Sequence, residues 1–192
     1  MKTFDIKGSK RVAGGKKAVK ALRKEGLVPC VIYGNGTEAT SFAVEETQFR
    51  NLIFTPNIYI VNVEIDGKVQ KAILKDLQFH PVSDELLHVD FLEVTDDKPV
   101  TIAIPISIEG NSEGVRAGGK LQVEMRKLIV KGLIKDLPDV LKIDITNLGL
   151  GKAMKVQDLT FDNLEVLNAK NAVVVSVRMT RAAKSAAAEA AK

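Results

Sequence analysis

Residues 100–108 alternate between large aliphatic side chains and smaller ones, and Ile102, Ile104, Ile106 and Ile108 fall on one side of an extended chain. A repeat of two residues is the period of a β-strand with one buried face and does not fit the 3.6-residue period of a helix. Similar short runs, rich in valine and isoleucine, recur at Thr3–Ile6, Val28–Tyr33, Ile58–Ile65, Val69–Leu77, His88–Val94, Leu128–Ile134, Val140–Ile145, Leu164–Leu167 and Ala172–Met179. The fold is therefore predicted to be mostly β with a few helices.

Turn signals divide these runs. Asp66-Gly67 between two strands is a strong hairpin signal, and Gly34-Asn35-Gly36 closes an earlier strand. Helical spacing is found in residues 16–25, which end at Gly26, and in Glu45–Phe54, which stops at Thr55-Pro56. Both helices lie in the first half of the chain.

The 192 residues suit two β-rich domains of about 90 residues each. Asp96-Asp97-Lys98-Pro99 interrupts the pattern, so the boundaries are predicted at 1–95 and 96–180. Gly110–Gly119 is expected to be a mobile, glycine-rich loop in an otherwise all-β second domain. Residues 181–192 form an alanine-rich tail with lysines, which is too short to hold a helix alone in water and is expected to be flexible.

Composition excludes several classes of protein. Cys30 is the only cysteine, which rules out an internal disulfide and a multi-cysteine zinc site and suits a reducing compartment. It lies in an apolar run and is expected to be a small core residue. No apolar run approaches the roughly 20 residues that span a bilayer, and the basic N-terminus leads into no signal-peptide core. A cytoplasmic protein without membrane contact is expected.

Charge is concentrated at the N-terminus. Residues 1–24 hold nine lysines and arginines against Asp5, a net charge of +8, whereas residues 25–95 hold four bases and eleven acids, a net charge of −7. Solubility requires only mixed charges, so this segregation indicates a surface that meets a polyanion. We call residues 1–24 the basic segment.

The bases of the expected helix share one face. At 100° per residue, Lys16, Lys17, Lys20, Arg23 and Lys24 fall within an arc of roughly 120°. Ala18, Val19, Ala21 and Leu22 occupy the opposite side and are expected to dock on the core. Residues 16–24 contain no acid that could neutralise the basic face, and the apolar side of the helix is too small for a membrane helix. Nucleic acid is therefore favoured over a solvated surface or an anionic membrane.

Nothing in the chain resembles a catalytic or cofactor site. The two histidines, His80 and His88, have no neighbouring serine or cysteine arranged as a nucleophile. The Gly-Gly-Lys sequences at residues 14–16 and 118–120 lack the remaining residues of a phosphate-binding loop. A metal site built from His80, His88 and Asp90 has no supporting spacing. No enzyme activity, cofactor, metal or small-molecule substrate is predicted.

A second polar surface is expected on the strands. Along residues 88–91, His88 and Asp90 share one face, while Val89 and Phe91 share the other. The same alternation directs Leu77 and Phe79 inward and leaves Gln78 and His80 outward. These polar side chains can hydrogen-bond to the edges of RNA bases. The Asp90 carboxylate would be repelled by phosphates, so its presence is favourable only if it accepts a hydrogen bond from a nucleobase or from a neighbouring group. A purely structural His88–Asp90 pair is the alternative.

These motifs resemble a known family. Arg11, Gly15 to Arg23 and the run Gly26 to Gly34, followed by Lys75-Asp76-Leu77-Gln78-Phe79-His80-Pro81 and His88-Val89-Asp90-Phe91, are similar in order and spacing to bacterial large-subunit ribosomal protein twenty-five. The continuation to about residue 180 resembles the two-domain type, the general stress protein CTC. The resemblance covers residues 1–95 by motif and the remainder by length and β pattern.

The resemblance implies an N-terminal closed β-barrel of six or seven strands with helices, which binds 5S ribosomal RNA in the central protuberance of the large subunit. It also implies a ribosome-associated protein. The exposed β edges of the second domain and its Gly110–Gly119 loop suggest protein or RNA neighbours in a larger assembly, among them neighbouring ribosomal proteins. Carried over residue by residue, the RNA contacts are Arg11, Lys16, Lys20, Arg23, Tyr33, Gln78, His88 and Asp90. Ala21 and Phe79 depart from the family pattern where members often carry bases, which implies fewer basic contacts.

Three other functions remain open. An anticodon-binding barrel resembling that of glutaminyl-tRNA synthetase would share the fold and charge but bind transfer RNA. A protein-interaction scaffold with a basic arm would bind its partner without RNA. A small hydrolase would depend on Cys30 as its nucleophile.

Overall fold

The structure is a computed structural model that describes residues 2–12 and 14–181. The predicted tail, 181–192, therefore lies outside the described residues except for Arg181. The chain divides into two compact units, Met1–Val100 with Leu133–Lys135, and Thr101–Gly132 with Asp136–Lys192. Within residues 2–12 and 14–181, no helix is both long and apolar enough to cross a membrane.

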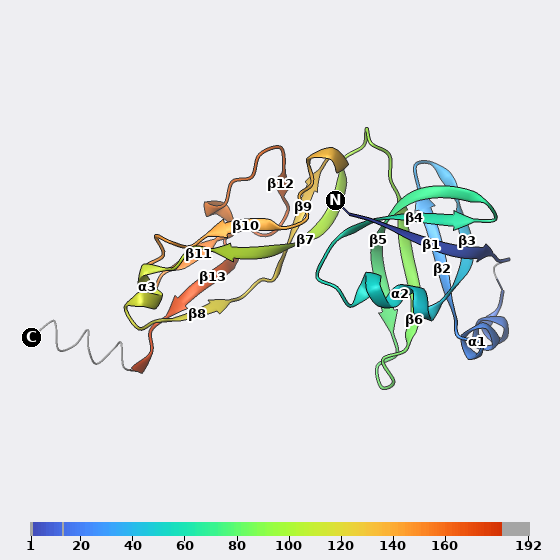
Figure 1. The fold of residues 1–192 in the computed structure, drawn as a ribbon, viewed down its shortest axis with the longest axis horizontal. Coiled ribbons are helices and arrows are strands. Elements are labelled where there is room, and N and C mark those ends of the chain that lie inside the picture. Colours follow the sequence, from blue (N-terminus) through green and yellow to red (C-terminus); the bar gives the residue numbers. More distant parts are fainter. Residues whose placement is uncertain (1, 13, 182–192) are drawn as a thin grey trace, which may run out of the picture. The chain divides into compact units, whose positions relative to one another are not determined.

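The first unit is a closed β-barrel whose strands follow the order β1-β3-β2-β6-β5-β4 (Figure 1). The strands are β1 (Lys2–Lys10), β2 (Leu27–Gly34), β3 (Thr37–Glu45), β4 (Tyr59–Ile65), β5 (Lys68–Phe79) and β6 (Leu86–Glu93). Parallel pairing of β1 with β4 closes the barrel, and β2 also pairs in parallel with β6. The predicted N-terminal closed barrel is confirmed.

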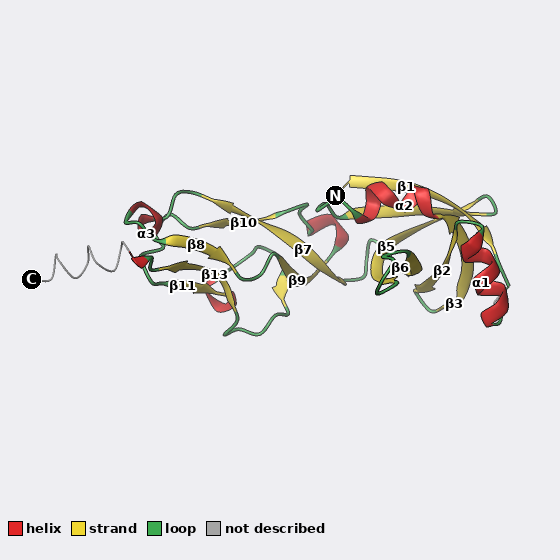
Figure 2. Ribbon diagram, turned by 90° about the horizontal axis from the view of Figure 1, so that it is seen from below, coloured by secondary structure: helices red, strands yellow, loops and turns green. Residues whose placement is uncertain are grey.

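Two helices accompany the barrel, α1 (Lys16–Lys24) and α2 (Glu46–Ile53), and they lie apart from each other in both Figure 1 and Figure 2. Gly26 follows α1 with a φ of 75°, a left-handed conformation that suits glycine, and its N–H bonds to the carbonyl of Arg23. The predicted stop of the basic helix at Gly26 is therefore confirmed.

The β4–β5 hairpin forms as predicted. Asp66 and Gly67 have φ values of 48° and 81°, and the register places Ile65 opposite Lys68. Both central residues of such a two-residue turn need a positive φ, which explains the Asp-Gly sequence.

Strand β3 was not predicted, although it is essential for closure because it lies between β1 and β2. Its sequence does not alternate cleanly. Phe42, Ala43 and Val44 are all buried in succession, and the preceding residues are mostly threonine, serine and alanine. A strand buried on both faces lacks the period of two, so only pairing with its neighbours identifies it.

The barrel core is apolar and centred on three phenylalanines. The ring of Phe91 on β6 lies 5.9 Å from that of Phe42 and 6.4 Å from that of Phe49, measured between centroids. Phe49 comes from α2, which also buries Leu52, so this helix packs into the barrel core. Cys30 belongs to the same cluster with no exposed surface, which confirms its predicted place in the core.

The second unit contains two small sheets and is also mostly β. Its strands are β7 (Val100–Glu109), β8 (Lys120–Val123), β9 (Lys127–Gly132), β10 (Leu141–Asp144), β11 (Ala153–Lys155), β12 (Glu165–Val166) and β13 (Val173–Arg178). The sheet orders are β10-β7-β9-β12 and β11-β13-β8. Val100, Ile102 and Ile104 on β7 are buried, as the alternation predicts. The short strands β8 and β11 were not predicted.

The glycine-rich segment 110–119 is a packed turn, which corrects the prediction of a mobile loop. It contains the short helix α3 (Glu113–Arg116), and the buried Ser112 hydroxyl donates to the carbonyl of Leu148. A Cβ on Gly119 would lie 2.5 Å from Val177 and 2.6 Å from the Gly114 carbonyl. These glycines allow close packing of the backbone, so their number does not indicate mobility here.

Candidate nucleic-acid interface

Three adjacent strands of the barrel carry a polar outer face. In β6, His88 and Asp90 point away from Val89 and Phe91, which are fully buried. The register of β5 places Gln78 opposite His88, and that of β2 places Val31 beside Asp90. Tyr33 lies two residues after Val31 on the same face of β2. Tyr33, Gln78, His88 and Asp90, four of the predicted contact residues, therefore share the outer face of β2, β6 and β5, which we call the polar strand face.

His88 and Asp90 form a close pair. His88 Nδ1 lies 2.6 Å from Asp90 Oδ1, and the two side chains keep 26% and 28% of their surface exposed. A contact this short between half-buried groups holds both side chains in defined positions, although they remain accessible from outside.

A β-bulge adds a further carboxylate to this face. The pairing steps from Leu74–Phe91 to Asp76–Asp90, so Lys75 is an extra residue in β5 and Asp76 lies directly opposite Asp90. Asp76 Oδ1 accepts a bond from the N–H of Leu77 at 2.9 Å. Asp76 was not among the predicted contacts, although it has the same parity as Gln78 in the strand and could have been found from that signal.

The electrostatics of the polar strand face act on Tyr33. Burial raises the pKa of its phenol, and the nearby negative charges of Asp90 and then Asp76 raise that pKa further. The hydroxyl therefore remains protonated at neutral pH and can donate a hydrogen bond.

Arg23 joins the basic helix to this face. Its Nε and one terminal nitrogen both donate to the carbonyl of Leu87, at 3.2 and 2.7 Å. Leu87 directly precedes His88 and is the second bulged residue, because Gln78 pairs with His88 and Phe79 with Leu86. The bulge leaves the Leu87 carbonyl available, and the two hydrogen bonds hold the Arg23 guanidinium against β6 immediately before His88.

Lys16 and Lys20 are exposed on α1, as contacts to phosphates would require. The docking of this helix is weaker than predicted, because none of its residues is buried and only Val19 and Leu22 are half-buried. Ala18 and Ala21, predicted to dock on the core, are exposed instead. Their side chains are too short to reach the barrel once Arg23 fixes the orientation of the helix.

Arg11 follows β1, and its backbone N–H donates to the carbonyl of Ser41. Its side chain is half-buried, and within the described residues its buried Nε has no hydrogen-bond partner. The positive charge lies close enough to Cys30 to oppose the rise in that thiol's pKa. Arg11 is therefore packed at the barrel wall and is less accessible than the lysines of α1.

His80 and Phe79 differ from the simple alternation. His80 Nδ1 accepts bonds from the N–H groups of Ser83 and Val82, at 3.1 and 3.4 Å, so this histidine closes its own turn and does not join the polar strand face. Phe79 was predicted to point into the core, but 39% of it is exposed. It pairs with buried Leu86 at the end of the barrel, where the core no longer covers it.

The chemistry of a hydrolase is not supported. The Cys30 thiol is fully buried and lies 3.4 Å from the carbonyl of Val28. Burial raises the pKa of this thiol well above its ordinary value, so the nucleophilic thiolate does not form. Among the described residues, no group of three or more His, Cys, Asp or Glu side chains could hold a metal ion.

Comparison with known proteins identifies both halves of the chain. Residues 6–91 match the Ribosomal L25p family, and residues 99–181 match the C-terminal domain of ribosomal protein TL5. A protein of Azobacteroides pseudotrichonymphae named large ribosomal subunit protein bL25 is 55% identical, over 96% of this chain and 98% of its own length. Proteins of the same name from Phocaeicola vulgatus and Porphyromonas gingivalis are 52% and 50% identical, over 100% and 97% of this chain and 100% and 98% of their own lengths.

The matches agree with the two-part architecture and with a role that is structural rather than enzymatic. They cover the barrel with its polar strand face as well as the second β unit, and they extend over nearly the full length of each relative. The chain therefore belongs to the ribosomal L25p family, in the form that carries a TL5-type C-terminal domain.

Proposed function

We propose that this protein is a structural component of the large ribosomal subunit in the cytoplasm, where its barrel binds 5S ribosomal RNA in the central protuberance. Its relatives carry the name of a large-subunit protein, and the motifs of residues 1–95 resemble those of the 5S-binding family. The observation that carries the proposal is the double hydrogen bond from Arg23 to Leu87, which places the basic helix beside the polar strand face.

The two parts of this interface suit different features of RNA. The exposed lysines of α1 match phosphates, which contribute affinity with little regard to sequence. The first turn of α1 contains Lys16 and Lys17 and no acid, although the positive end of the helix dipole disfavours cations there. A bound phosphate would relieve that repulsion, which supports a polyanionic ligand.

The polar strand face suits unpaired bases. Asp90 Oδ1 is engaged by His88, and Oδ2 is the second acceptor atom of this carboxylate. That oxygen can accept from the amino or imino group of a base, while the Tyr33 hydroxyl and the Gln78 amide supply donors. Two carboxylates on a surface that approaches RNA would weaken generic binding, so we infer that this face reads base identity.

The proposal is tested by measuring binding of the full chain to 5S ribosomal RNA, to transfer RNA and to an unrelated structured RNA of similar length. Tighter binding of 5S RNA over a range of salt concentrations is expected. Tighter binding of transfer RNA would favour the anticodon-binding alternative, and equal binding of all three would leave only a generic basic arm. Partner binding that survives RNase treatment would favour the scaffold alternative.

We also propose that RNA binding resides in residues 1–95, since all eight predicted contacts lie there. This fragment should fold, as judged by circular dichroism, and keep the affinity of the full chain for 5S RNA within about threefold. A folded fragment that no longer binds would place part of the site in the second unit.

A further inference from the structure

An apolar groove opens on the barrel beside α2. It has a volume of about 230 Å³ and is lined by α2, by the end of β5 and by the turn before β6. Phe49 and Leu86 form its buried floor, while Phe54 and Phe79 stand at its edge with 74% and 39% of their surface exposed. Two exposed phenylalanines at one apolar groove form a patch of the kind that another molecule covers.

The rim of the groove is acidic. Glu46 and Asp84 line it together with a single base, Arg50. Their neighbours Glu45 and Glu85 are also exposed. The groove is therefore an apolar slot whose surrounding charges favour a cationic partner.

This groove is separate from the proposed RNA interface. None of the eight predicted RNA contacts lines it, and α2 lies apart from α1 in Figures 1 and 2. Residues 25–95, which build the groove, carry eleven acids and four bases, in contrast to the nine bases and one acid of residues 1–24. The barrel thus presents surfaces of opposite charge.

We propose that the α2 groove is a docking site for a lysine- and arginine-rich segment of a neighbouring protein that inserts an aromatic or aliphatic side chain between Phe54 and Phe79. The apolar floor of the groove suits the inserted side chain, and the carboxylates of Glu46 and Asp84 suit the lysines and arginines on either side of it. RNA is disfavoured because its phosphates would face these carboxylates. A second copy of the chain is disfavoured because two copies meeting groove to groove would bring two acidic rims together. Its basic helix is also a poor occupant, since the exposed apolar residues of α1 are alanines, which are too small to serve as the inserted side chain.

A tryptophan reporter tests the proposal with the full chain. The protein contains no tryptophan, so Phe54→Trp gives a single fluorophore at the edge of the groove. The first probe is a short peptide of lysine and arginine around a central Leu-Phe pair. The second replaces its bases with glutamate, and the third replaces the Leu-Phe pair with serines. The first peptide should shift the tryptophan emission to shorter wavelength and bind about tenfold more tightly than either of the others.

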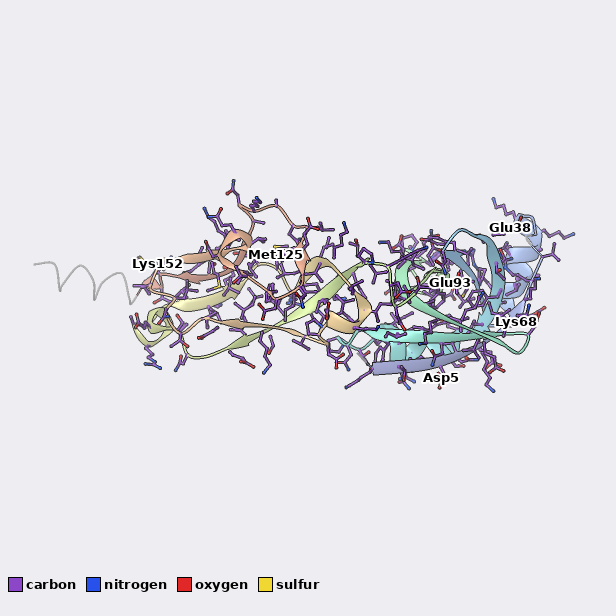
Figure 3. All side chains as sticks on the ribbon, turned by 90° about the horizontal axis from the view of Figure 1, so that it is seen from above. Asp5, Glu38, Lys68, Glu93, Met125 and Lys152 are labelled. Atoms are coloured by element: carbon purple, nitrogen blue, oxygen red, sulfur yellow. The ribbon has the colours of Figure 1, made fainter. Side chains whose placement is uncertain are left out.

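Charge variants in the reporter background separate the groove from the general acidity of the barrel. Glu46→Lys should weaken binding of the first peptide by about threefold to tenfold. Glu38→Lys, an exposed acid on β3 that does not line the groove (Figure 3), should leave binding unchanged. Equal affinity for all three peptides, or equal effects of the two variants, would overturn the proposal. Affinity of Glu46→Lys for 5S RNA should not fall, so failure here is distinct from failure of the proposed RNA function.

A photo-cross-linking amino acid identifies the natural occupant. This amino acid replaces Phe54 in protein that is assembled into large ribosomal subunits. On irradiation it should label a lysine- and arginine-rich peptide of another protein. Val69 is a matched control position, since it is 64% exposed on the barrel and does not line the groove. Cross-links from position 54 to nucleotides or to a second copy of the chain would overturn the proposal, as would a yield no higher than from position 69.

Discussion

Helix α1 and the polar strand face lie side by side, yet they are built on opposite physical plans. The lysines of α1 are exposed, and its nine residues include no acid and no buried side chain. The strand residues His88 and Asp90 are half-buried, paired with each other and fixed above a core of phenylalanines. Exposed charges attract any polyanion, whereas fixed and paired groups can distinguish one nucleobase from another. We therefore propose that the helix contributes affinity for RNA and that the strands contribute specificity.

The strongest test of this division is Asp90→Ala. Removal of the carboxylate that is proposed to accept a hydrogen bond from a nucleobase should weaken binding of 5S RNA by about 1–3 kcal/mol. Binding of unrelated RNA should stay level or rise, because an acid leaves the surface. Filter binding to both RNAs measures the difference. Asp5→Ala is a matched control on the outer face of β1, where Asp5 bonds to Asn62 (Figure 3). An equal loss for both RNAs in a folded Asp90→Ala protein would make Asp90 structural.

Arg23 links the two regions, so its removal should affect both. Arg23→Ala loses the two hydrogen bonds to Leu87 and should weaken binding of every RNA by about 1–2 kcal/mol. Hydrogen exchange should show faster opening of α1 with an unchanged barrel. Arg23→Lys keeps the charge but not the forked geometry, and should recover only part of the affinity. Full recovery with lysine would show that Arg23 contributes charge alone.

A change at Tyr33 tests whether the polar strand face that contacts RNA extends to the end of β2. The raised pKa keeps its hydroxyl protonated, and as a donor to RNA it should contribute about 0.5–1.5 kcal/mol. Tyr33→Phe should therefore weaken 5S RNA binding with no change in melting temperature. The loss should be constant from pH 6 to 9, because the folded-state pKa lies above the ordinary value of 10.0 and the phenol does not ionise in this range. If affinity is unchanged throughout a salt titration, the ring only closes the end of the barrel.

The smallest effects are expected from the helix lysines taken singly. Lys16→Ala and Lys20→Ala should each weaken 5S RNA and unrelated RNA to the same extent, by less than about tenfold. Each should lower the slope of log affinity against log salt by about 0.7–0.9. Glu38→Ala, on an exposed part of β3, should leave the slope unchanged and serves as a control. A lysine variant that discriminated between the two RNAs would contradict the division of roles.

Much of the candidate site could be predicted because local patterns carry it. Alternation in residues 88–91 places His88 and Asp90 together whatever the neighbouring strands do, and the charge of the basic segment is visible directly. The pairing of Arg23 with Leu87 could not be predicted, because it joins residues 64 positions apart and depends on a bulge. The position of Asp76 opposite Asp90 depends on a second bulge at Lys75, which no local pattern marks.

The sequence alone determined the β character of the chain, the hairpin at Asp66-Gly67, the end of α1 at Gly26 and the segregation of charge. Each of these depends on residues close together in the chain, through the period of a strand, a positive φ or simple composition. The tertiary structure decided barrel closure through β3, the exposure of Phe79, the role of His80 and the packed turn at Gly110–Gly119. These features depend on which distant residues become neighbours. Local sequence periodicity does not predict whether a distant strand or loop buries a residue.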